Sequence, residues 1–560
     1  MSRRSQLLIA FLIAAAIGPA AAQQPAFTRA DTLRGSITPE RAWWDVVFYD
    51  LHVKLDPADS TVRGWNAITY RVTGPPRALQ IDLQMPLEID SVVQGGKRLA
   101  HRRDGNAFFI GTAGKQPRGA TRMLTVYYHG KPRVAEKPPW DGGVIWARDP
   151  DGAAWISTAC QGLGASVWWP VKDTQADEPD SQRVALTVPD SLQAISNGRL
   201  RGVARGSDGW STWEWFVTSP INSYVVAPYI GRYAQWTETY EGERGHLTLD
   251  FRPLVRHVDG ARRQWQQVRP MLKCFEHWFG PYPWYADGFR LIEAPHLGME
   301  HQSAVAYGNG YQNGYKGHDL SGTGWGLTWD FIVVHESAHE WWGNSITTAD
   351  LADMWVHEAF ANYAESLFTE CQYGPAAGAA YVRGVRKLIK NDKPIVAAYG
   401  VNASGSGDMY YKGGNMLHTI RHAIGNDSVW RATLRGLQAE FGHEVVTGRQ
   451  VQEYISRRAG VDLRRVFEQY LTTTMIPVFE YRLDGSTLAY RWTNVVRGFD
   501  MPIRVFVAPD SSVRLSPTAA WQSARLSLAN PEDFRVDENF FVQARRVERV
   551  NTRSPTGTGH

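Results

Sequence analysis

The period of the hydrophobic pattern changes twice along the 560-residue chain, and this change constrains the fold most strongly. From about residue 45 to 250 apolar residues alternate with polar ones, as over Leu51–Leu55. Turn signals such as Gly95-Gly96 separate the runs, so this part predicts a large antiparallel β domain. From about 255 to 470 apolar residues recur at helical spacing, and from about 475 to 548 short alternating runs return.

The chain is therefore predicted to be a multidomain α+β protein, which agrees with its length because a domain holds roughly 100–200 residues. We expect a signal peptide over 1–22, an N-terminal β domain over 23–252, a mainly helical domain over 253–472, a small C-terminal β-sandwich over 473–550 and a tail over 551–560.

The first residues follow the order of a secretory signal peptide. Arg3 and Arg4 precede the apolar run Leu7–Ile17, and Ala20-Ala21-Ala22 offers a small-residue cleavage site. The run is short for a bilayer, and no other stretch has about 18 apolar residues. We expect export to the periplasm or the medium without a membrane span after cleavage; an uncleaved anchor is the alternative.

Charge and cysteine content exclude several classes of protein. The 60 Lys and Arg residues nearly balance the 56 Asp and Glu residues, which gives no support to a nucleic-acid partner. Cys160, Cys274 and Cys371 form neither a disulfide scaffold nor a paired-cysteine zinc motif. At most one disulfide is possible, and we expect buried free thiols instead. We also expect a monomeric or weakly oligomeric protein that is stabilised by its hydrophobic cores.

The chemistry concentrates in residues 333–343. His335 and His339 are four positions apart, which on a helix places both imidazoles on one face, about 5–6 Å apart at Cβ. Two such ligands can share one zinc ion. Glu336 is the next residue round the helix, so its carboxylate can reach a water at the metal without binding the metal.

A third ligand is needed for a catalytic zinc site with one open position. Glu358 lies 19 positions after His339, far enough for the first helix to end near Gly343-Asn344 and a second helix to return. Zinc would polarise an amide carbonyl and activate a water, and Glu336 would act as general base and acid. The predicted reaction is hydrolysis of an amide bond with one Zn²⁺ per chain.

These residues resemble the aminopeptidase N family of zinc metallopeptidases, the gluzincins, which also contains leukotriene-hydrolase-type enzymes. The family pattern is H-E-x-x-H, eighteen residues, then Glu, and His335, Glu336, His339 and Glu358 match it. The resemblance implies an N-terminal antiparallel β saddle, a thermolysin-like, mainly helical catalytic domain and a small C-terminal β-sandwich. Here His357 and Ala359 replace the usual Asn and Gly beside the zinc-binding Glu.

A second match concerns the substrate. Leu297-Gly298-Met299-Glu300-His301 resembles the family's G-x-M-E-N segment, in which the Glu binds the free α-amine. The resemblance implies that Gly298, Met299 and Glu300 contact substrate and that a fixed carboxylate pairs with the ammonium group. His301 replaces the usual Asn. Ser303 to Tyr307 would then form an edge strand that pairs with the peptide.

Two further matches complete the predicted site. Tyr410-Tyr411-Lys412-Gly413 resembles the family's Y-x-K-G motif, which assigns stabilisation of the oxyanion to Tyr410. Because the tyrosine is doubled, Tyr411 is the alternative. Gln161, upstream of an Asp177-Glu178-Pro179 segment that is also similar to the family, would help to hold the substrate's N-terminus.

We therefore predict a zinc aminopeptidase that acts on peptides with a free N-terminus. The alternatives are another zinc hydrolase on the same site, such as an epoxide hydrolase or a broader peptidase, or a catalytically silent binding protein.

Overall fold

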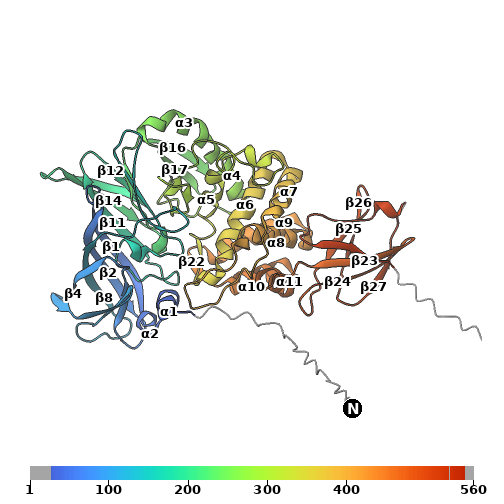
Figure 1. The fold of residues 1–560 in the computed structure, drawn as a ribbon, viewed down its shortest axis with the longest axis horizontal. Coiled ribbons are helices and arrows are strands. Elements are labelled where there is room, and N and C mark those ends of the chain that lie inside the picture. Colours follow the sequence, from blue (N-terminus) through green and yellow to red (C-terminus); the bar gives the residue numbers. More distant parts are fainter. Residues whose placement is uncertain (1–26, 529, 549–560) are drawn as a thin grey trace, which may run out of the picture.

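The computed structural model describes residues 27–528 and 530–548, so the predicted signal peptide and tail lie outside the described residues. A strand-rich N-terminal part, a helical middle and a C-terminal group of strands follow one another along the long axis (Figure 1). The predicted multidomain α+β fold class is confirmed. None of the described helices is long and apolar enough to cross a bilayer.

The N-terminal part is built on an eight-stranded sheet of order β13-β14-β11-β1-β2-β8-β4-β5. Its neighbours pair antiparallel, as predicted, except that β1 pairs parallel with β11. The elements here are α1 (Arg29–Gly35), α2 (Pro39–Ala42), β1 (Trp44–Asp56), β2 (Thr61–Val72), β3 (Leu79–Asp82), β4 (Glu88–Gln94), β5 (Lys97–Leu99), β6 (His101–Asp104), β7 (Ala107–Ile110), β8 (Thr121–Gly130), β9 (Gly143–Arg148), β10 (Ala154–Ala159), β11 (Ser181–Pro189), β12 (Gln193–Ile195), β13 (Arg199–Arg205), β14 (Trp210–Val217) and β15 (Tyr229–Gly231).

A five-stranded sheet of order β16-β17-β18-β20-β19 joins the first two parts of the chain. Its strands are β16 (Trp236–Gly242), β17 (Gly245–Arg252), β18 (Phe289–Glu293), β19 (Gly298–Met299) and β20 (Val305–Tyr307). The sheet crosses the predicted boundary at residue 252, and the domain division stays a prediction. The edge-strand prediction for Ser303 to Tyr307 is wrong, because β20 lies between β18 and β19 and the edge is β19.

The helical middle contains the two helices of the predicted zinc site, α5 and α6. Its elements are α3 (Val258–Gln264), α4 (Val268–Phe279), α5 (Phe331–Ala338), β21 (Ile346–Thr348), α6 (Trp355–Tyr373), α7 (Pro375–Gly384), α8 (Tyr411–Ile424), α9 (Asp427–Phe441), β22 (Glu444–Val446), α10 (Gly448–Ala459) and α11 (Arg464–Thr472). Pro270 does not interrupt α4, because it lies in the first turn, where a missing N–H is tolerated.

A polar side chain fixes the start of α5, and the helix ends earlier than predicted. The Asp330 side chain caps its first turn by accepting from the N–H groups of Ile332 and Val333. The helix ends at Ala338 with His339 as its cap residue, earlier than the predicted end near Gly343. His339 keeps a helical backbone (φ −64°, ψ −17°), so both histidines still share one face. Gly343 then turns the chain at φ +119°.

The expectation that all three cysteines are free is wrong for two of them. Cys274 of α4 and Cys371 of α6 form a disulfide with their Cα atoms 6.0 Å apart, whereas Cys160 is free and buried. Because the two cysteines are 97 positions apart in the sequence, only the packing of α4 against α6 brings them together, and spacing alone carries no signal for the bond.

Two sheets form the C-terminal part, of orders β27-β24-β23-β29 and β26-β25-β28, in agreement with the predicted sandwich. Their strands are β23 (Val478–Asp484), β24 (Thr487–Thr493), β25 (Ile503–Ala508), β26 (Ser511–Leu515), β27 (Gln522–Arg525), β28 (Arg535–Val536) and β29 (Gln543–Arg546). One buried apolar cluster runs from Tyr240 to Phe540, so these strands share a core with the helices.

The disulfide gives a testable contribution to stability. Reduction of the Cys274–Cys371 bond should lower the free energy of unfolding by about 2–4 kcal/mol, because it frees a long loop in the unfolded chain. Thermal unfolding with and without reductant measures this. The midpoint of Cys371→Ala should be insensitive to reductant, whereas that of Cys160→Ala should still fall on reduction. A wild-type midpoint that reductant leaves unchanged would contradict the assignment.

Candidate metal centre and substrate cleft

Helices α5 and α6 bring the three predicted metal ligands together. One donor atom each from His335, His339 and Glu358 lies within 4.8 Å of the other two, and all three residues are buried. Glu358 Oε2 is 3.4 Å from His339 Nε2 and 3.8 Å from His335 Nε2. The helix that follows α5 thus returns its first turn to the face that carries both imidazoles.

The outer ring nitrogens of the two histidines are already bound. His335 Nδ1 contacts the Glu365 carboxylate at 2.8 Å, and His339 Nδ1 contacts the Trp342 carbonyl at 2.9 Å. Each contact fixes the ring and directs Nε2 into the cluster. Within the described part of the chain, buried Glu358 Oε2 accepts no hydrogen bond. Two inward nitrogens and one unsatisfied carboxylate oxygen therefore fit a cation.

The donor set fits zinc. Two imidazoles and one carboxylate are the protein ligands of many catalytic zinc sites, which leave a fourth position for water or substrate. Although burial raises the pKa of Glu358, the His339 and His335 imidazoles hold it well below its usual range. The ligand carboxylate is therefore ionised.

Glu336 lies beside the cluster without belonging to it. Glu336 is 9 % exposed and, like the three ligands, lines a cleft of about 500 Å³. Burial raises the pKa of Glu336 to about 7, which suits a group that exchanges protons near neutral pH. A Cβ on Gly298 would come within 2.6 Å of Glu336 Oε1, so only glycine at this position of β19 leaves the carboxylate its room.

The predicted amine anchor is built from both sides of the cleft. Gln161 Nε2 donates to Glu300 Oε1 at 2.7 Å and to Glu358 Oε1 at 2.8 Å. The Tyr224 hydroxyl donates to Glu300 Oε1 at 3.2 Å. Burial, with Glu358 nearby, raises the pKa of Glu300. Gln161 and Tyr224 come from the N-terminal part of the chain, whereas Glu300 and Glu358 follow residue 252, so the anchor lies between the two parts.

Tyr410 and Tyr411 both line the cleft, at the start of α8. The Tyr410 ring lies 6.0 Å from the His335 ring, and its pKa is raised by burial and by Glu358. Tyr410 is therefore a neutral phenol next to the ligand cluster and can donate a hydrogen bond. All nine predicted site residues, including Met299, lie on the wall of this one cleft.

The two histidines that depart from the family pattern are buried and neutral. His357 Nε2 accepts from the Thr348 N–H at 3.0 Å, and burial lowers the pKa of His357 to about 3. His301 Nδ1 contacts the Tyr229 hydroxyl, and burial holds the pKa of His301 well below its usual range. Both replacements therefore serve the packing around the site and do not reach into it.

Sequence reasoning missed four polar residues around the site: Tyr224, Glu340, Asn344 and Glu365. Asn344 Nδ2 donates to the Glu300 carbonyl at 2.9 Å and to Glu340 Oε2 at 3.2 Å, so it supports the anchor loop. Glu365 lies seven positions after Glu358, on the same face of α6, and this spacing is a signal that could have found it. Tyr224 and Glu340 Oε1 bind groups that are distant in sequence, Glu300 in the first case and Tyr282 and Ser303 in the second, and left no such signal.

Beyond the polar groups, the cleft has an apolar wall. It is lined by Pro139, Trp140, Leu297, Tyr315, Leu320, Phe331 and Ile332. The Phe331 ring stacks on the His335 ring at 5.1 Å and contacts the Tyr315 ring at 5.2 Å. A peptide that enters the cleft therefore meets aromatic surface next to the ligand cluster.

Residues 271–470 match the Peptidase family M1 domain. The chain is 23 % identical over 355 residues to "Aminopeptidase N" of Streptomyces lividans, a match over 57 % of this chain and 40 % of that protein. It is 23 % identical over 338 residues to "Aminopeptidase B" of Homo sapiens, covering 55 % and 47 %. The chain therefore spans about half the length of these curated relatives or less.

Solved structures share the fold. An M1 zinc metallopeptidase from Deinococcus radiodurans superposes with a TM-score of 0.68 at 20 % identity, covering 80 % of this chain and 98 % of that one. A mutant M1 zinc metallopeptidase from the same organism, bound to a Tyr-Ser-Ala substrate, superposes with a TM-score of 0.66 at the same identity and coverage. At this identity the likeness concerns the fold.

The contact between Glu365 and His335 predicts an effect on metal binding. Glu365→Gln should weaken Zn²⁺ binding about 10–100-fold, because an amide keeps the shape but removes the charge that orients the ligand imidazole. Competition with a chromophoric chelator measures the affinity. Glu370→Gln is the matched control: Glu370 lies on the same helix but pairs with Arg421 at 2.6 Å. Equal Zn²⁺ affinity of the Glu365→Gln variant and the wild type would show that the contact does not tune the ligand.

Proposed function

We propose, from the premise that residues 271–470 belong to peptidase family M1, that this chain is a zinc-dependent aminopeptidase. It removes N-terminal residues from peptides with a free α-amine. His335, His339 and Glu358 hold the zinc ion, and Glu336 and Tyr410 act on the scissile bond. Glu300, Gln161, Gly298 and Met299 contact the substrate's N-terminal end.

One observation carries this proposal: three carboxylates, of Glu300, Glu336 and Glu358, face one buried cleft. Glu300 is 3 % exposed and Glu358 is 1 % exposed, so water does little to offset their mutual repulsion. A divalent metal ion and one substrate ammonium group supply a balancing charge. An endopeptidase, which cuts peptide bonds within a substrate chain, binds no free α-amine and would have no need of the Glu300 carboxylate.

The proposed mechanism divides the work among residues of the chain. Zinc, when bound, supplies a Lewis acid that polarises the scissile carbonyl and lowers the pKa of water. Glu336 accepts a proton from the attacking water and returns it to the leaving amine. The Tyr410 hydroxyl donates to the oxygen on which negative charge develops. Glu300 accepts from the ammonium group, which fixes how far the chain enters and makes the first peptide bond the one that is cut.

Export is part of the proposal. The signal-peptide pattern of residues 1–22 favours it, and so does the Cys274–Cys371 disulfide, because such bonds persist in oxidising compartments. Periplasm and medium both satisfy this argument. The monomeric state stays a prediction.

Glu336→Gln tests the catalytic role. The variant should bind Zn²⁺ as the wild type does and lose about 10²–10⁴-fold in kcat, because the amide cannot take up the proton of the attacking water. Metal content and hydrolysis of aminoacyl-naphthylamides measure the two properties.

The same assay separates the alternatives. Acetylation of the substrate's N-terminus should abolish hydrolysis by the wild type, since the ammonium group is then lost. Hydrolysis of blocked peptides would indicate a broader peptidase, and wild-type turnover of the Glu336→Gln variant would exclude the mechanism. Zinc binding without hydrolysis of any aminoacyl-naphthylamide or peptide tested would indicate a catalytically silent binding protein.

Tyr410→Phe and Tyr411→Phe form a matched pair that tests the assignment of the oxyanion donor. Tyr410→Phe should lower kcat about 10²–10³-fold with little change in KM, because the donor acts in the transition state. Tyr411→Phe should retain kcat within about threefold. The opposite outcome, in which only Tyr411→Phe loses kcat, would move the role by one residue.

A further inference from the structure

Helix α1 lies between the two parts of the chain that form the substrate anchor. On one side, Asp31 O accepts from the Asn402 N–H at 3.1 Å. A Cβ on Gly35 would come within 2.1 Å of the Val401 carbonyl carbon, so the end of α1 packs backbone to backbone against that segment. The next contact along the chain, from the Gly400 N–H to Asp350 Oδ2 at 2.8 Å, leads to the start of α6, which carries Glu358.

On its other side, α1 holds the loop that carries Gln161. Arg34 Nε donates to the Leu163 carbonyl at 3.4 Å, and Arg34 Nη1 donates to the Asp173 carbonyl at 2.6 Å. Arg34 Nη2 pairs with Asp173 Oδ1 at 3.3 Å. The Arg34 side chain is only 18 % exposed and that of Asp173 is 2 % exposed, so water screens this pair weakly. The Arg34 guanidinium thus binds two backbone carbonyls and one carboxylate at once.

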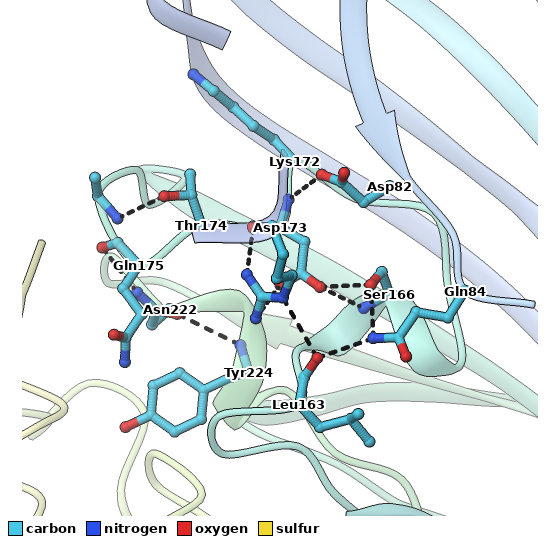
Figure 2. A network of polar contacts seen from close by, with 12 residues as sticks. Asp82, Gln84, Leu163, Ser166, Lys172, Asp173, Thr174, Gln175, Asn222 and Tyr224 are labelled. Atoms are coloured by element: carbon cyan, nitrogen blue, oxygen red, sulfur yellow. Dashed lines mark hydrogen bonds and ion pairs between the residues drawn. The ribbon is translucent and has the colours of Figure 1, made fainter. Parts of the chain in front are cut away.

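Asp173 also accepts hydrogen bonds from Ser166, at the far end of the loop. Its Oδ2 accepts from the Ser166 N–H at 3.1 Å and from Ser166 Oγ at 2.5 Å. Gln84 Nε2 adds bonds to the Leu163 carbonyl at 2.9 Å and to Ser166 Oγ at 3.1 Å. Figure 2 shows Leu163, Ser166, Asp173 and Gln84 converging on one cluster, with Tyr224 nearby.

The loop between these fixed points is short and tightly folded. The Leu163 N–H donates to the Gln161 carbonyl at 2.8 Å, and the Gly164 N–H donates to the Cys160 carbonyl at 2.7 Å. A Cβ on Gly164 would come within 2.1 Å of Asp173 Oδ2 and 2.4 Å of Arg34 Nη2, and its φ is +97°. Glycine is therefore required for the guanidinium and the carboxylate to approach the loop. Only Gly162 separates Leu163 from Gln161, and the Leu163 N–H binds the Gln161 carbonyl, so a displacement at Leu163 would also move Gln161.

We propose that Arg34 is a positioning residue for recognition of the substrate's α-amine. It acts through the Leu163 carbonyl and Asp173 to hold Gln161 where its amide reaches both Glu300 and Glu358. Helix α1, packed against residues 401–402, thereby sets the distance between the loop and α6. This inference rests on the proposed aminopeptidase function and extends it to a residue outside the cleft.

A double-mutant cycle tests this inference. We would measure kcat and KM for an aminoacyl-naphthylamide with the wild type, Arg34→Met, Gln161→Ala and the double variant. Arg34→Met should raise KM about tenfold and leave kcat within about twofold, because the amine is bound equally in the ground and transition states. If Arg34 acts through Gln161, the double variant should have no higher KM than Gln161→Ala alone.

Arg29→Met is the matched control. Arg29 lies on the same helix and pairs with Asp104 at 2.8 Å, but its side chain is 68 % exposed and has no contact with the loop that an ion pair or hydrogen bond provides in the described chain. The KM of the Arg29→Met variant should equal that of the wild type. Thermal unfolding of every variant separates a positioning role from a loss of stability, and Arg34→Lys replaces Arg34→Met in the cycle if the latter does not fold.

Two results would overturn the inference: an unchanged KM in a folded Arg34 variant, or KM increases that multiply in the double variant. Either result leaves the proposed function intact as long as the wild type hydrolyses free-amine substrates. A wild type that hydrolyses none of them would instead refute the proposed function.

Discussion

The burial of three carboxylates around one cleft is the constraint on which the rest of this structure depends. Glu300, Glu336 and Glu358 lie where water screens them weakly, and the surroundings act on each carboxylate in a different way. The two ligand imidazoles stabilise the ionised form of Glu358, burial brings the pKa of Glu336 to about 7, and Gln161 bridges Glu300 to Glu358. Such a site is costly when empty of cations, and under the proposed function a metal ion and a substrate ammonium group would offset that cost.

The orientation of the ligands follows from groups that never touch the metal. His335 is directed by Glu365 from α6, and His339 by the Trp342 carbonyl at the end of its own helix. The early end of α5 is therefore useful: in a helix that continued through Gly343, the Trp342 carbonyl would point along the axis toward the helix C-terminus, away from the His339 imidazole. The left-handed Gly343 completes the turn, and a side chain there would press on the rings of His339 and His357.

Local patterns in the sequence predicted the parts of this molecule that local physics determines. The change of hydrophobic period predicted the order of sheets and helices, and the spacing of His335, His339 and Glu358 predicted a cluster because both helices have a fixed pitch. Contacts between distant segments were not predictable in this way. The Cys274–Cys371 disulfide, the edge position of β19 and the contacts of Glu340 Oε1 with Tyr282 and Ser303 all depend on how elements pack, which a single sequence does not encode at any fixed spacing.

The division of the anchor between two parts of the chain has a further physical consequence. Gln161 and Tyr224 come from the N-terminal part, whereas Glu300 and Glu358 come from the part that follows, so their hydrogen bonds of 2.7 to 3.2 Å exist only while the two parts keep one relative position. A hydrogen bond weakens steeply when its donor angle falls below about 120°, and it is lost once the heavy atoms are about 3.6 Å apart. Buried contacts at the junction, such as that of Asn197 Nδ2 with the Gln302 carbonyl at 2.7 Å, therefore help to keep the four residues in place, and under the proposed function they would support substrate recognition as well. Under the proposed function, the packing that joins the two parts and the hydrogen bonds that position the amine-binding residues are one set of interactions.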